Sequence, residues 1–99
     1  MTIDKTKMKI LKAGVKAWLK DADSVTASNI GRMCGMTHAN VLYHFPYGVK
    51  DAVAEYAFKQ KIVPIVAQLI TIGSPVVKEL STLERLDYLK AFADHKKSC

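Results

Sequence analysis

Residues 26–45, TASNIGRMCGMTHANVLYHF, contain the pattern that decides the fold of this chain. Apolar and small residues in the first half recur at helical spacing, which predicts a short helix over residues 27–34. Gly35 can adopt a positive φ at little cost, so we expect it to end that helix. A further short helix is expected over residues 38–44. The resulting order of helix, glycine-centred turn and helix is that of a helix-turn-helix motif.

Threonines stand immediately before both of these helices. Thr26 and Thr37 can each accept a hydrogen bond from a backbone N–H of the first turn, so we expect both to be N-caps. Val41, Leu42 and Phe45 are the apolar side chains expected to pack inward from the second helix and its end.

A longer helix is expected to precede this pair, over residues 2–20. Its apolar face would hold Met8, Leu11, Val15, Trp18 and Leu19. An adjacent stripe holds Lys5, Lys9, Lys12, Lys16 and Lys20. The stripe is consistent with a solvated face or with attraction to phosphate groups, and the reasoning from residues leaves both open. Because Trp18 shares the apolar face, we expect it in the core rather than at a membrane surface.

The second half of the chain also predicts helices. A fourth helix should begin near residue 49, and Pro64 should either kink it or end it near Ile62. Ser81 and Glu84 form a capping-box pattern, which predicts a last helix over residues 82–95 with an apolar stripe of Leu83, Leu86, Leu89 and Ala93. The predicted fold class is therefore all-α.

We expect one compact domain. A three-helix unit with the helix-turn-helix motif, over residues 1–48, would be followed by two or three C-terminal helices over residues 49–99. The apolar run over residues 62–70 and the final helix would supply a dimer contact.

The net charge of +6 is distributed unevenly along the 99 residues. Residues 1–50 carry eight Lys or Arg and three Asp, whereas residues 51–99 carry seven Lys or Arg and six Asp or Glu. A basic half followed by a nearly neutral half suggests that one part binds a polyanion and the other binds protein.

The polar residues at the start of the second short helix suit DNA recognition. In a helix-turn-helix the second helix enters the major groove, and its N-terminal residues contact base edges. Thr37, His38 and Asn40 can hydrogen-bond to bases or phosphates, while the small Ala39 allows close approach of the backbone. Thr26 offers a hydroxyl to a phosphate, and Lys50 could reach the DNA backbone from the next helix.

Residues 10–58 resemble the DNA-binding domain of the tetracycline-repressor (TetR) family. The matching residues are Trp18, Thr26, Ile30, Gly31, Cys34, Gly35, Met36, Thr37, Leu42, Tyr43, His44, Phe45 and Lys50. The family usually has Ala where this chain has Gly31 and Cys34, and Gly where it has Ala39. Counted from Thr37, Tyr43 stands one residue late, whereas counted back from Phe45 the His44 position matches. Either the second short helix is one residue longer than in the family or Leu42 replaces the usual Tyr, and Lys50 stands two residues late. The resemblance implies that phosphate contacts come from among Tyr43, His44 and Tyr47, without deciding which of them.

About fifty residues follow the second short helix, far fewer than the family's usual ligand-sensing region. That length hardly allows an enclosed pocket of ~300 Å³ or more, so no small-molecule effector is expected. The predicted function is that of a sequence-specific regulator of transcription, a repressor, that binds double-stranded DNA as a homodimer. The alternatives are a non-regulatory DNA-binding protein, such as an architectural, replication or packaging factor, and a protein-interaction adaptor.

Several other classes of protein are not expected from this sequence. The sequence has no paired carboxylates in a plausible pocket, no glycine-rich phosphate loop and no activated nucleophile, so we expect neither an enzyme nor a cofactor. Cys34, His38 and His44 have a spacing unlike that of zinc sites, so no metal is expected. The two cysteines, Cys34 and Cys99, and the lack of a signal-peptide pattern predict a cytoplasmic protein without membrane association.

Overall fold

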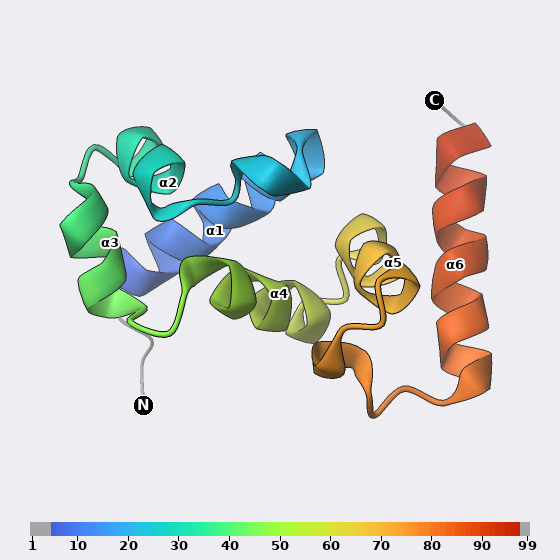
Figure 1. Ribbon diagram of the computed structural model, residues 1–99. Helices are drawn as coiled ribbons and strands as arrows, with labels where there is room; N and C mark the ends of the chain where they lie inside the picture. Colours follow the sequence, from blue (N-terminus) through green and yellow to red (C-terminus); the bar gives the residue numbers. More distant parts are fainter. Residues whose placement is uncertain (1–4, 98–99) are drawn as a thin grey trace. The chain divides into compact units, whose positions relative to one another are not determined.

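The computed structural model describes residues 5–97, with side chains through Asp94, and helices are the only regular secondary structure among these residues (Figure 1). The helices are α1 (Lys5–Lys20), α2 (Ala27–Cys34), α3 (His38–His44), α4 (Val49–Lys59), α5 (Val63–Thr71) and α6 (Thr82–Lys97), with the short 3₁₀ helices η1 (Ala22–Ser24) and η2 (Pro75–Val77). The predicted all-α class is therefore confirmed. The expected helix start at Thr2 and the expected reduced thiol of Cys99 lie outside the described residues.

The chain divides into two compact units, one up to Tyr56 and one from Ala57 onward. The division lies inside α4, so this helix contributes residues to both units. In the first unit, α2 packs against both α1 and α3.

The buried face of α1 differs from the one expected from the sequence. Ile10, Gly14, Ala17 and Trp18 are buried, whereas Leu19 is 52 % exposed. The observed face is rotated by about 100°, one residue's turn, from the predicted one. Gly14 explains the difference, because the absence of a Cβ there allows the side chain of Val53 from α4 to lie directly against the α1 backbone.

Pro64 ends the fourth helix rather than kinking it. The N–H of Ile62 donates to the carbonyl of Ala57 (3.0 Å) and the N–H of Lys61 donates to that of Phe58 (3.1 Å). These two bonds form a Schellman motif, with Lys61 in the left-handed region at φ 56°. A new helix, α5, then begins with Pro64 in its first turn, where a missing N–H costs no hydrogen bond.

In the second unit, α5 packs against η2 and α6. The predicted capping box is confirmed, since the Ser81 N–H donates to Glu84 Oε1 (3.0 Å) and the Glu84 N–H donates to Ser81 Oγ (3.2 Å). The Arg85 guanidinium donates to the carbonyls of Leu80 (3.2 Å) and Val77 (3.3 Å), which ties α6 to the loop before it.

The two apolar segments expected at a dimer contact differ in their exposure. Ile65, Val66 and Leu69 of the run expected at a dimer contact are buried within the chain's own core. On α6, Leu83 is 74 % exposed and Leu86 is also exposed. The side chains that this helix partly buries are Arg85, Tyr88, Leu89 and Phe92.

Candidate nucleic-acid interface

The turn between α2 and α3 is a second Schellman motif. The N–H of Met36 donates to the Gly31 carbonyl (2.8 Å), and the N–H of Gly35 donates to the Arg32 carbonyl (3.4 Å). Gly35 has φ 70°, a left-handed conformation that favours glycine. The predicted role of Gly35 and the predicted bounds of both helices are confirmed.

Gly31 lets this turn fold closely onto α2. A Cβ at Gly31 would lie 2.8 Å from the carbonyl oxygen of Met36 and 3.3 Å from the carbonyl group of Thr37. Real Cβ atoms essentially never come within 3.0 Å of such an atom. The glycine therefore fixes how near the start of α3 lies to α2, a constraint that the sequence analysis did not foresee.

Both predicted N-caps are confirmed. Thr26 Oγ1 accepts a hydrogen bond from the Asn29 N–H, and Thr37 Oγ1 accepts one from the Asn40 N–H, each at 3.1 Å. Each threonine is exposed at its helix N-terminus. The caps use the oxygens as acceptors, so each hydroxyl hydrogen can still be donated to an external acceptor.

The first turn of α3 presents its side chains to solvent. Thr37, His38, Ala39 and Asn40 are all exposed, whereas Val41 is fully buried and anchors the helix. The Asn40 amide nitrogen lies 4.0 Å from the Met36 sulfur, which is a weak contact. Asn40 therefore keeps its hydrogen-bonding groups available for an external partner.

The end of α3 carries exposed aromatic side chains. Tyr43 is 80 % exposed and forms an edge-to-face contact with the His44 ring at 5.3 Å between centroids. Tyr47, in the following turn, is 95 % exposed. Leu42, expected to pack inward, is exposed instead, because the helix is anchored through Val41 one residue earlier.

A hollow of about 420 Å³ lies beside His44. Its lining includes Lys7 and Tyr47 but also the carboxylates of Asp51 and Glu55. These carboxylates repel phosphate, so the C-terminal end of α3 is electrostatically less suited to the DNA backbone than the N-terminal turn.

Lys50 has a partner that the sequence analysis missed. Its ammonium nitrogen lies 5.5 Å from the centroid of the Trp18 ring, within the range of a cation–π interaction. Trp18 can be read from the sequence, but its proximity to a lysine 32 positions later cannot be predicted from it. Contact with a phosphate would compete with this interaction.

The structure thus brings Thr37, His38 and Asn40 together on one exposed turn, with Tyr43 and His44 at the other end of the same helix. Thr26 lies at the start of α2 and Lys50 at the start of α4. Among the described side chains, no three His, Cys, Asp or Glu residues gather as a metal site.

Comparisons with protein-family models, curated proteins and solved structures find no match for this chain. In the part of the chain that the structure describes, no helix combines the length and the apolar character needed to cross a bilayer.

Proposed function

We propose that the chain is a sequence-specific, double-stranded DNA-binding regulator of transcription in which the N-terminal turn of α3 reads bases in the major groove. The observation that carries this proposal is the exposed row formed by Thr37, His38, Ala39 and Asn40 above the buried Val41. An α-helix fits the major groove, and a carboxamide such as that of Asn40 can bond to adenine through two atoms.

The surrounding charge supports a polyanionic partner. α1 contains six lysines, and neither α1 nor α2 contains an Asp or Glu. Lysines contribute affinity for phosphate without regard to sequence, whereas the α3 side chains would supply discrimination. Thr26 at the α2 N-terminus and Lys50 are the proposed backbone contacts.

We further propose that the regulator acts as a homodimer and as a repressor without a small-molecule sensor. Leu83 and Leu86 stand three residues apart on α6 and are exposed, so a second copy could cover them. Two copies would place their α3 helices in successive major grooves about 34–36 Å apart on a nearly palindromic site.

Selection from a pool of random duplexes, followed by gel-shift titration at two salt concentrations, tests DNA recognition. Asn40→Ala should cost ~1–3 kcal/mol of discrimination at one base position. Lys50→Ala should weaken binding to all sequences alike and lower the salt slope by about 1. Matched controls are Gln60→Ala and Lys90→Ala, which remove an exposed carboxamide and an exposed ammonium group elsewhere.

The same experiment distinguishes the proposed function from the two alternatives. Binding without enrichment of any sequence would indicate an architectural or packaging role. No binding at low salt would indicate a protein-interaction adaptor and would refute the proposal.

A further inference from the structure

α1 and α2 run in opposite directions and enclose a groove on the surface of the first unit. The Cys34 thiol, at the end of α2, lies 3.8 Å from the carbonyl of Lys9, and the Ser24 hydroxyl, just before α2, donates to the carbonyl of Ala17 (2.9 Å). Two adjoining hollows of about 460 Å³ and 260 Å³ lie along this pair, and both are lined by Lys16 and Met33.

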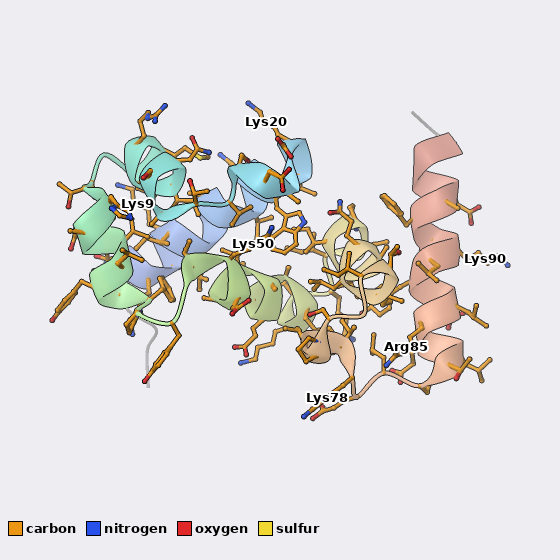
Figure 2. All side chains as sticks on the ribbon, viewed as in Figure 1. Lys9, Lys20, Lys50, Lys78, Arg85 and Lys90 are labelled. Atoms are coloured by element: carbon orange, nitrogen blue, oxygen red, sulfur yellow. The ribbon has the colours of Figure 1, made fainter. Side chains whose placement is uncertain are left out.

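One wall of this groove is a row of lysines. Lys9, Lys12, Lys16 and Lys20 all line it, and their spacing places them on a single face of α1. Lys9 and Lys20 are labelled in Figure 2 and lie toward opposite ends of the helix. The row is about 16 Å long at 1.5 Å per residue. Its described lining holds one carboxylate, that of Asp21, so a negatively charged occupant is favoured.

Away from these charged side chains, the lining is apolar except for Ser24 and Asn29 in the larger hollow. Met33 is 47 % exposed and contributes to both hollows, beside Ala13, Ala17 and Cys34. Methionine adapts its shape to a partner and is common at protein-binding surfaces. Phosphate groups alone would leave this apolar surface uncovered, whereas a peptide can cover it and also supply charge.

We propose that this lysine groove, lined by Lys9, Lys12, Lys16, Lys20 and Met33, binds an acidic amphipathic helix of a partner protein. The partner's apolar side chains enter the two hollows beside Met33, and its carboxylates face the lysine row. Docking of a helix through apolar side chains at i, i+3 or i+4, and i+7 is a recurrent mode of recognition. The proposal uses none of the α3 side chains, but it assigns to a protein partner four of the six α1 lysines that would otherwise attract phosphate.

The test uses the full chain and a fluorescein-labelled helical peptide with Leu along one face and Glu on its flanks. Fluorescence anisotropy should show saturable binding. Met33→Ser should weaken it about fivefold, as expected for losing roughly half of a methionine's burial. Reversing two charges with Lys12→Glu and Lys16→Glu should weaken it by about tenfold or more. Circular dichroism verifies that both variants keep their helical content.

Matched controls separate a groove from general stickiness. Leu19→Ser removes an apolar side chain of similar exposure that does not line the groove, and Lys78→Glu with Lys90→Glu makes the same change in net charge on the second unit. Neither should alter peptide affinity. Equal binding of a peptide with Ser in place of every Leu would overturn the proposal, as would unchanged affinity for Met33→Ser. The proposal would also be overturned if the variant with Lys12→Glu and Lys16→Glu lost duplex binding but kept peptide binding. That result would assign the groove to nucleic acid.

Discussion

Replacing Gly31 by Ala tests whether the α2–α3 turn is held as closely as the structure indicates. In an unhindered helix interior, Gly→Ala stabilises a protein by ~1 kcal/mol, since glycine loses more backbone freedom on folding. At Gly31 the new methyl group would lie 2.8 Å from the Met36 carbonyl oxygen. To reach an ordinary contact of 3.4 Å, that oxygen must retreat by about 0.6 Å.

The retreat has a cost because the atom belongs to the backbone of a hydrogen-bonded turn. Moving Met36 strains its 2.8 Å bond to the Gly31 carbonyl. Overpacking of this kind costs ~1–3 kcal/mol. After subtracting the gain of ~1 kcal/mol in helix propensity, the expected net effect is a destabilisation of about 1 kcal/mol. This corresponds to a fall in Tm of roughly 4–8 °C for a domain of this size.

Urea denaturation followed by tryptophan fluorescence measures the change in the free energy of unfolding of the first unit, which contains Gly31. Trp18 is the one tryptophan of the sequence and is buried in the same unit as Gly31. Ser28→Ala is the control, because Ser28 is exposed on α2 and the substitution adds no atom. A surface change of this kind should alter the free energy of unfolding by no more than about 0.5 kcal/mol. If Gly31→Ala instead raised that free energy by ~1 kcal/mol, the inferred close approach would be wrong.

Three further predictions concern other parts of the chain. Lys61→Gly should stabilise the second unit by ~0.5–1 kcal/mol, measured in a urea titration followed by circular dichroism. A non-glycine residue at positive φ costs ~1–2 kcal/mol, and the larger backbone entropy that glycine loses on folding offsets part of this gain. Hydrogen bonds from the Ser81 N–H and hydroxyl lower the pKa of Glu84 below its ordinary value of 4.5, so its charge contributes stability above about pH 4.5 that is lost as the pH falls through the lowered value. Glu84→Gln should remove that pH dependence in an acid titration of α6 helicity, and an unchanged titration would contradict this cause. Gly14→Ala should reduce stability by ~1–3 kcal/mol, because the new methyl group clashes with Val53. Adding Val53→Ala to the same chain should recover part of that stability in thermal unfolding. If it did not, the clash with Val53 would not be the cause of the loss.

The local signals in the sequence predicted the α2–α3 region well. Thr26, Thr37 and Gly35 act through bonds to residues a few positions away, so residue type and spacing are sufficient to place them. The candidate DNA-contacting residues were chosen from the same local order, and Thr37, His38, Asn40 and Tyr43 are exposed. Their contact with DNA stays a prediction.

Features that depend on distant residues could not be predicted. Gly14 carried no signal in the sequence, yet a Cβ there would clash with Val53 of α4. Lys50 was expected as a contact to the DNA backbone, yet its ammonium group lies over Trp18. Lys61 was missed for a local reason, because it occupies the C′ position of the Schellman motif at which glycine is the usual sequence signal.

The short length of α3 links the stability of the first unit to its proposed function. A seven-residue helix has little stability by itself in water, so the orientation of α3 depends on the Thr37 cap, the buried Val41 and the close approach at Gly31. A loss of about 1 kcal/mol leaves most molecules folded at room temperature. Any loss of DNA affinity in Gly31→Ala would then report a displaced α3 rather than unfolding. Gly14→Ala supplies the contrast, since its clash lies between α1 and α4 and should reduce stability while leaving base discrimination by α3 unchanged.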